Sequence, residues 1–457
     1  MIIRLTTFLA IVVIINASVA AQTSRSRDTI LEQMQQAVSF LGQGKLDDAE
    51  TILRHVVAVD PGNFDAHNLL GTVLDQHQQF KAAEQEYRTA LRIKPDSVGA
   101  LANLAVLLTR TGRSDEAMRV FQSVLAKSPD HPQATLNLGI QYVARGDYGR
   151  AIPLLERAAR LDLNSYTVNY NLGVAYLNCK RYDDARNVLQ SAASSNPKAA
   201  EPLYYLGLIA WNQKNDDAAA DFWDRAVGLR SHFPEANFML GEVLRKNHRD
   251  LAAIDFYKLA LDQDPTKFVH YVRLGGTYIL LGQTGSAVEV FRRAVTKFPD
   301  RAEAHYFAGI AARAAADYGG AETELRKSLS LERDNVNALA QLGFVLLERD
   351  RVAEAEVTLR RAVAINHKHF FANYNLGRLL VKNRRYDEAL PFLQHAALLK
   401  TNNPAVHYQL FLALSRLQRK TDADRELVIF KQLDAQRKAN GVGVDDDEME
   451  NPPSQTP

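Results

Sequence analysis

The chain has 457 residues, of which 46% are hydrophobic and 24% are charged, the composition of an ordinary folded protein. Its formal net charge of +2 gives no support for a nucleic-acid-binding protein, because such proteins carry a clear excess of Lys and Arg. The single cysteine excludes an internal disulfide, and with it a disulfide-stapled fold.

Residues 1–21 have the layout of a secretory signal peptide. Arg4 precedes an apolar run over residues 8–15, and small residues follow up to Ala20 and Ala21, after which we expect cleavage. An uncleaved membrane anchor is the alternative, although polar residues interrupt the apolar stretch and leave it short for a span. The sequence therefore predicts an exported protein, in a bacterial periplasm or secreted, without a stable membrane span.

A polar linker, residues 22–29, leads into a region that repeats itself every 34 residues. The phrase NYNLGVAYLNCKRYDDA begins at Asn169 and returns as NYNLGRLLVKNRRYDEA at Asn373, six periods later. Ala recurs twelve residues after the glycine of this phrase, as at Ala185 and Ala389. The glycine itself recurs, with Ala105 in the one gap, as Gly71, Gly139, Gly173, Gly207, Gly241, Gly275, Gly309, Gly343 and Gly377.

Each period predicts two helices. Leu203, Leu206 and Ala210 have the spacing of a buried helical stripe, and a second stripe through Ala219 and Trp223 follows a polar break. Proline ends the second helix, because it has no N–H and clashes with the preceding turn. It recurs as Pro95, Pro129, Pro197, Pro265 and Pro299. Asp is expected to cap the start of the second helix, as Asp47, Asp115, Asp183 and Asp387.

A 34-residue period with Leu-Gly, then Ala, an aromatic residue or Leu, Ala and Pro resembles the tetratricopeptide repeat family. The resemblance implies an all-α fold, an α-solenoid superhelix of about twelve repeats over residues 30–437, whose first and last units have Ala37 and Phe411 in place of Gly. Residues 438–457 follow as an acidic tail that we expect to be disordered, since it has almost no large apolar side chains. From Asn440 onward it contains five acids and no base.

The sequence contains no pattern that points to catalysis. There is no HExxH, paired CxxC or GxSxG motif, and the glycines follow the repeat rather than a phosphate-binding loop. Cys179 lies in a polar break with no His or acid held beside it by the repeat. His367 and His369 lack a third metal ligand. We therefore predict a non-enzymatic protein with no catalytic residue, no metal site and no cofactor.

A binding surface has better support. In the family, the first helices line a concave groove, with positions two, five, six, nine, twelve and thirteen facing it when the glycine is position eight. Around residue 200 these positions carry more apolar and aromatic area than the packing of one helix needs, although contacts between repeats would also explain it. The residues are Tyr170, Tyr204, Leu208, Trp211 and Phe238.

Asparagine occupies position six in three successive repeats, at Asn103, Asn137 and Asn171. A carboxamide has donors and an acceptor, so it can bind a peptide backbone whatever its side chains are. The predicted function is thus an exported scaffold that binds a protein or an extended peptide in its groove, in cell-envelope assembly, secretion or export. The alternative is a glycan-binding accessory of a polysaccharide synthesis or export enzyme, because aromatic faces and amides also suit sugars. The sequence identifies neither the partner nor the oligomeric state.

Overall fold

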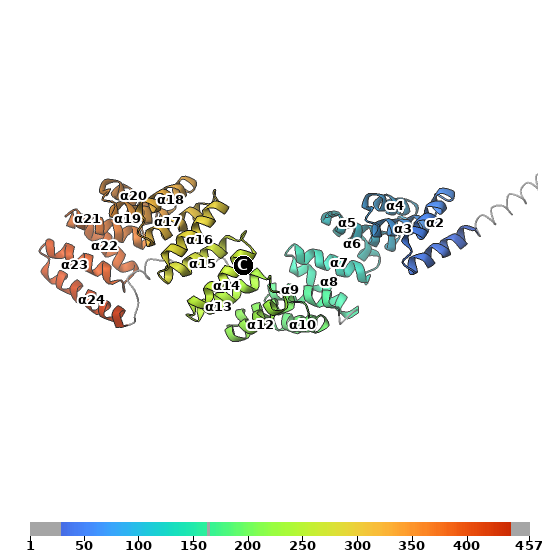
Figure 1. The fold of residues 1–457 in the computed structure, drawn as a ribbon, viewed down its shortest axis with the longest axis horizontal. Helices are drawn as coiled ribbons and strands as arrows, with labels where there is room; N and C mark the ends of the chain where they lie inside the picture. Colours follow the sequence, from blue (N-terminus) through green and yellow to red (C-terminus); the bar gives the residue numbers. More distant parts are fainter. Residues whose placement is uncertain (1–28, 162–164, 440–457) are drawn as a thin grey trace, which may run out of the picture. The chain divides into compact units, whose positions relative to one another are not determined.

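The computed structural model describes residues 29–161 and 165–439, which divide into two compact units, Met1–Arg225 and Ala226–Pro457 (Figure 1). In the described residues every regular element is a helix, so the predicted all-α solenoid is confirmed. The predicted signal peptide, nearly all of the linker and residues 440–457 of the tail lie outside the described residues.

The helices alternate between a first and a second helix of each repeat. In unit 1 a helix over residues 29–42 is followed by α2 (Leu46–Val59), α3 (Phe64–Gln76), α4 (Phe80–Ile93), α5 (Val98–Arg110), α6 (Ser114–Lys127), α7 (Pro132–Ala144), α8 (Tyr148–Leu161), α9 (Tyr166–Asn178), α10 (Tyr182–Ser195) and α11 (Glu201–Asn212). The boundary between the units falls within α12 (Asp216–Leu229).

Unit 2 continues the same alternation. It contains α13 (Pro234–Lys246), α14 (Asp250–Gln263), α15 (Phe268–Leu280), α16 (Thr284–Lys297), α17 (Ala302–Ala314), α18 (Tyr318–Leu331), α19 (Val336–Glu348), α20 (Val352–Ile365), α21 (Phe370–Lys382), α22 (Tyr386–Leu399), α23 (Pro404–Arg416) and α24 (Lys420–Ala439).

Helix packing within each unit gives the stack an inner and an outer side. In most repeats the first helix packs on the second helix of its own repeat and also meets the first helix of the next, as α5 meets α7 and α19 meets α21. Successive second helices make at most marginal contacts among the described residues. The first helices therefore lie on the inner side of each curved stack. We call positions two, five, six, nine, twelve and thirteen of the first helices the inner face.

The glycine that recurs at position eight, which we call the register glycine, marks the closest approach of the two helices of a repeat. A Cβ built on Gly71 would lie 2.7 Å from the Tyr87 ring, and one on Gly377 would lie 2.5 Å from Leu393 Cδ2. Real Cβ atoms are essentially never found at such distances, so the opposing side chain or its helix would have to shift. The residue opposite each glycine is large and buried: Tyr87, Leu155, Leu189, Trp223, Tyr257, Phe291, Leu325, Leu359 and Leu393.

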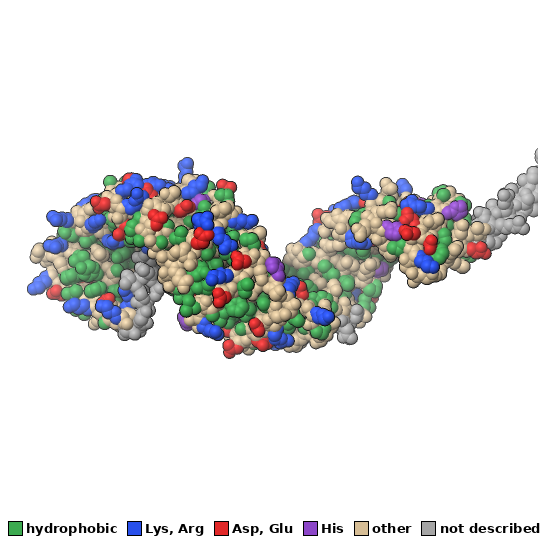
Figure 2. All heavy atoms as spheres, in the orientation of Figure 1, with side chains coloured by type: hydrophobic (Ala, Val, Ile, Leu, Met, Phe, Trp, Pro, Cys, Tyr) green, Lys and Arg blue, Asp and Glu red, His purple; other side chains and the backbone are tan. Residues whose placement is uncertain are grey.

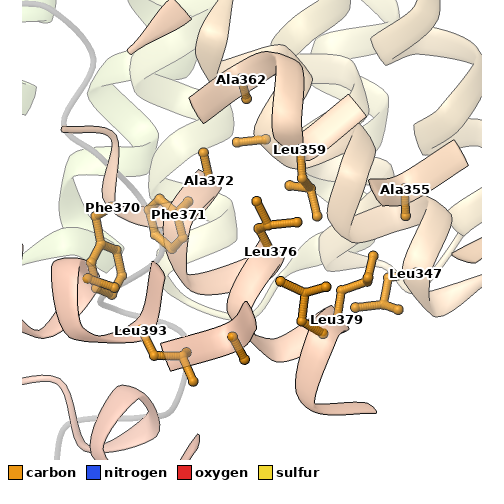
Figure 3. Packing of buried hydrophobic residues seen from close by; sticks show 14 of the residues in the cluster. Leu347, Ala355, Leu359, Ala362, Phe370, Phe371, Ala372, Leu376, Leu379 and Leu393 are labelled. Carbon is orange, nitrogen blue, oxygen red and sulfur yellow. The ribbon is translucent and has the colours of Figure 1, made fainter. Parts of the chain in front are cut away.

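From α17 to α24 of unit 2 one buried cluster runs from each repeat to the next, and Figure 3 shows part of it. Leu347 of α19 and Leu359 of α20 belong to the same buried cluster as Leu376 and Leu379 of α21. A repeat thus gains its stability from its neighbours as well as from its own helix pair.

The predicted aspartate caps are wrong by two residues. The N-cap of α2 is Lys45 and that of α10 is Arg181, while Asp47 and Asp183 lie in the first helical turn. There their charge still faces the positive end of the helix dipole.

An N-cap arginine instead links successive second helices. Arg113 donates from Nη1 to Glu84 at 2.8 Å, and Arg385 donates in the same way to Glu356. Arg351 binds Glu322, which Arg326 also binds at 2.7 Å. Burial alone would raise the pKa of the Glu322 carboxyl, but the guanidinium hydrogen bonds outweigh it and the pKa is lowered. These carboxylates therefore stay ionised and hold the outer side together.

Two adjacent glycines of α15 test whether position eight requires glycine for close helix packing. The Gly275→Ala Cβ would overlap the Phe291 ring, whereas the Gly276→Ala Cβ would meet nothing within 4 Å. We expect Gly275→Ala to lower the free energy of unfolding by about 1–3 kcal/mol through overpacking. Gly276→Ala should raise it by about 0.5–1 kcal/mol, because alanine loses less backbone entropy in a helix. Urea denaturation followed by circular dichroism measures both, and equal midpoints for the two variants would contradict this account of the glycine.

Candidate functional site

Four tyrosines gather on the first helices of unit 1 and form what we call the tyrosine cluster: Tyr166, Tyr170, Tyr204 and Tyr205. Tyr166 and Tyr170 lie one turn apart on α9 with their rings stacked, 5.8 Å between centroids and 10° between planes. Tyr170 meets the edge of Tyr205 on α11 at 5.7 Å, and Tyr205 meets Tyr204 at 5.4 Å. The cluster therefore joins two successive repeats through ring contacts.

The rings of the cluster are partly exposed, which distinguishes them from the core. Burial raises the pKa of the Tyr170 phenol above its ordinary value, and the neighbouring Tyr205 adds to the shift. This phenol therefore keeps its proton at neutral pH and can donate a hydrogen bond. The sequence predicted Tyr170 and Tyr204 as binding residues. It missed Tyr166, which opens its helix, and Tyr205, which interrupts the row of asparagines.

Leu208 and Trp211 continue the surface toward the end of α11, and both are partly exposed. The Trp211 ring lies 6.1 Å from that of Trp223, which is fully buried. Trp223 Nε1–H also donates to the backbone carbonyl of Tyr204 at 3.0 Å. Trp223 thus holds α11 in place, and α11 carries three of the predicted binding residues, Tyr204, Leu208 and Trp211.

The three asparagines do not share one arrangement. Asn137 and Asn171 each donate from Nδ2 to the carbonyl four residues earlier, at 2.8 Å. This bond orients the carboxamide and uses one of its two N–H donors. Asn103 instead donates to Asn68 Oδ1 of the preceding repeat at 3.3 Å. Only Asn137 and Asn171 therefore present equivalent amides, on α7 and α9.

Phe238 does not belong to this surface. It lies on α13 in unit 2 and is only 7% exposed. Its ring packs against Tyr257 of α14 at 5.8 Å and His270 of α15 at 5.3 Å. Packing between repeats, which is the alternative explanation for the aromatic positions, accounts for the burial of this ring, so we do not include Phe238 in the proposed binding surface.

The inner face of unit 1 carries four charged side chains. Asp75 and Arg110 pair at 2.9 Å, and position two adds Asp65 and Glu201. The Glu201 carboxylate contributes to the raised pKa of the Tyr170 phenol. In the part of the chain that the structure describes, no group of three His, Cys, Asp or Glu side chains is placed to hold a metal ion. Among the same residues no helix is long and apolar enough to cross a membrane. The chemistry that this surface offers is aromatic contact and neutral hydrogen bonding.

A stack of helix pairs with such a surface defines a helical-repeat scaffold protein. Family models described as tetratricopeptide repeat match residues 76–138, 142–211 and 312–376, residues 34–98 and 277–338, and residues 372–405. Together these matches cover more than half of the chain, which belongs to the tetratricopeptide repeat family.

Among curated proteins, the chain is similar to the type IV pilus assembly protein PilF of Pseudomonas aeruginosa. The two are 32% identical over 71 residues, which span 15% of this chain and 28% of PilF. A solved structure of Pseudomonas aeruginosa PilF matches with 23% identity over 47% of this chain and 97% of that one, at a TM-score of 0.42. YrrB, described as a repeat protein with an unusual peptide-binding site, matches with 18% identity over 40% of this chain and 95% of its own, at a TM-score of 0.38.

The two tryptophans of the chain give a test of this geometry. In Trp223→Phe the remaining emission comes from the partly exposed Trp211, and in Trp211→Phe it comes from the buried Trp223. We expect acrylamide to quench the Trp223→Phe variant several-fold more efficiently. Equal quenching of the two variants would contradict the placement of Trp211 on the surface.

Proposed function

We propose that unit 1 binds an extended segment of a partner protein across α9 and α11. The observation that carries this proposal is the tyrosine cluster, a set of partly exposed rings on two successive first helices. Tyrosine and tryptophan supply a large contact area at a small entropic cost, and they dominate the energetics of protein interfaces. Leu208 and Trp211 extend the same apolar area along α11.

Recognition on this face depends on shape and backbone rather than on charge. Asn137 and Asn171 keep one N–H and the carboxamide oxygen outside their intrahelical bonds, and these groups match a peptide N–H and C=O. Asn103 contributes less, because its amide already bonds Asn68. Binding through these rings and amides should change little with salt, since they carry no charge to be screened.

A glycan chain is the second candidate ligand. The stacked pair of Tyr166 and Tyr170 offers a flat apolar face of the kind on which a sugar ring packs, and the amides supply the polar contacts. Immobilised polysaccharide and a displayed library of unstructured peptides distinguish the two ligands. If the full chain is retained on the polysaccharide and binds none of the peptides, the glycan proposal replaces the peptide proposal.

The setting that we propose is cell-envelope assembly, secretion or export in a bacterium. Its support is the signal-like layout of residues 1–21 and the local similarity to a pilus assembly protein. N-terminal sequencing of the protein from its native source should give Ala21 or Gln22 as the first residue. Recovery of an intact Met1 in a membrane pellet would instead show an uncleaved anchor.

Two substitutions address the binding surface. Tyr170→Ala and Tyr204→Ala each remove one ring of the cluster without touching a register residue. We expect the better anchor of the two to cost about 2 kcal/mol of binding free energy, roughly a 30-fold loss of affinity, with little change in helix content. Titration of a selected peptide, followed by calorimetry or fluorescence anisotropy, measures this loss.

The matched control is Tyr182→Ala, which removes a partly exposed tyrosine from the second helix α10 of the same unit. This control should keep the affinity. Trp223→Ala opens a cavity in the core and should lower the free energy of unfolding by about 3–5 kcal/mol. If Tyr170→Ala and Tyr204→Ala lose stability to that extent while they retain the peptide, the cluster is packing between repeats and not a binding surface.

A further inference from the structure

Three repeats contain a buried histidine at position four of the first helix. Its Nδ1 lies within hydrogen-bonding distance of a glutamate on the second helix of the same repeat. The pairs are His67 with Glu86 at 2.5 Å, His305 with Glu324 at 2.6 Å, and His407 with Glu426 at 2.6 Å. The Nε2 atom of each ring lies 2.9 to 3.3 Å from the backbone carbonyl six residues earlier, in the turn before the helix. Each ring therefore connects the preceding turn to the second helix.

These histidines belong to the interior of the stack. Their residues are only 8%, 5% and 7% exposed in the order given. On the face of the molecule in view in Figure 2, histidine covers only small separate areas, whereas Lys, Arg, Asp and Glu cover much more. A polar ring in such surroundings needs partners for both of its nitrogens.

The glutamate accompanies the histidine in the sequence. Across the twelve repeats, position 23 is Glu in the three repeats that have His at position four, and it is another residue in the other nine. Where position four is Asn, position 23 is apolar, as in Asn373 with Phe392. Asn373 Nδ2 donates to the carbonyl of His367, six residues earlier, at 2.8 Å. Asparagine therefore reproduces the carbonyl contact of the histidine, and the carboxylate is present only where a ring can use it.

The two contacts match a protonated ring. A carboxylate oxygen and a carbonyl oxygen both accept hydrogen bonds, and neither can donate one. A neutral imidazole has one N–H and satisfies one of these acceptors, whereas the imidazolium has two and satisfies both. The carboxylate also balances the positive charge that the ring then carries in the interior.

The pair in the last described repeat combines this geometry with a shifted pKa. The hydrogen bond with Glu426 raises the pKa of the His407 ring, the Thr401 carbonyl adds to the rise, and burial opposes it. The helix α23 packs on α24, α22 and α21. Among the charged and titratable groups of these three helices, Glu426 of α24 is the one that acts on the pKa of the ring.

This repeat is also placed to open by itself. Among the described residues, α23 and α24 are supported by other helices from one side, where Val406 and Leu410 of α23 join the buried cluster that contains Leu393 of α22. Terminal units of such a stack have fewer neighbours and lower local stability than internal ones. We propose that the protonated His407–Glu426 pair closes α23 and α24 on the stack, and that loss of the proton loosens this repeat.

The direction of the pH dependence follows from the shift. Because the pKa of His407 is raised in the folded repeat, the pair stabilises the repeat fully below the pKa of the unfolded chain. This stabilisation is lost as the pH rises through the folded pKa, when either Glu426 or the Thr401 carbonyl loses its donor. The repeat is therefore more tightly closed in mildly acidic solution than above neutral pH. The device concerns unit 2 and does not depend on peptide binding by unit 1.

Hydrogen exchange of the full chain, followed by mass spectrometry, tests the proposal. After correction for the intrinsic exchange rate, the protection factors of α23 and α24 should fall between about pH 6 and about pH 8. The expected fall is up to about tenfold for each pH unit between the unfolded and the folded pKa of His407. The helices α9 and α10 serve as the internal control, because their repeat has Asn169 and Val188 at the two positions. Unchanged protection of α23 and α24, or an equal fall in α9 and α10, would overturn the proposal.

Three variants assign the effect to the pair. His407→Asn keeps a donor for the carbonyl and removes the titrating ring, and Glu426→Gln keeps an acceptor and removes the charge. Each should abolish the fall in α23 and α24, whereas the matched control His232→Asn, at an exposed histidine of the same unit, should retain it. A full fall in His407→Asn or in Glu426→Gln would overturn the proposal. Circular dichroism at about pH 6 checks folding, and Glu426→Gln alone decides the matter if His407→Asn does not fold.

Discussion

The contact between the register glycine and the large side chain opposite it determines the rest of the repeat. With hydrogen in place of Cβ, the first helix approaches until the ring of Tyr87, Trp223 or Phe291 lies directly on its backbone. One side of each first helix is thereby committed to its own second helix. The remaining positions are divided between the next repeat and the inner face, so a single steric constraint decides which residues are available for binding.

Because that constraint involves few positions, the inner face is free to differ from one unit to the other. Unit 1 presents tyrosines and amides on α9 and α11. Unit 2 presents Arg313 and Arg378 beside the ring of Phe344. Both units are built from the same kind of helix pair, so they differ in the side chains of their first helices and not in the fold.

The fold was predictable because its determinants are periodic in the sequence. Glycine, alanine and proline mark helix contact and helix end at fixed intervals, and α4 does end at Ile93, just before Pro95. The turn between the two helices was not predictable in this way. The middle of its three residues adopts a positive φ in every repeat, yet glycine occupies this place only at Gly44, Gly112, Gly146 and Gly282. The other eight repeats use residues such as Lys180 and Asp350, because helix packing imposes the left-handed conformation whatever the residue prefers.

The candidate site shows where position within the repeat stops being informative. Tyr170, Tyr204 and Phe238 all occupy position five, and all were predicted to face a ligand. The two tyrosines are partly exposed, whereas Tyr257 and His270 close over Phe238. Register decides the direction of a side chain, but the volume of its neighbours on the next two helices decides whether it reaches the surface. Those neighbours are brought together only by the packing of successive repeats, so the exposure of an inner-face residue is a property of three helices and cannot be derived from one.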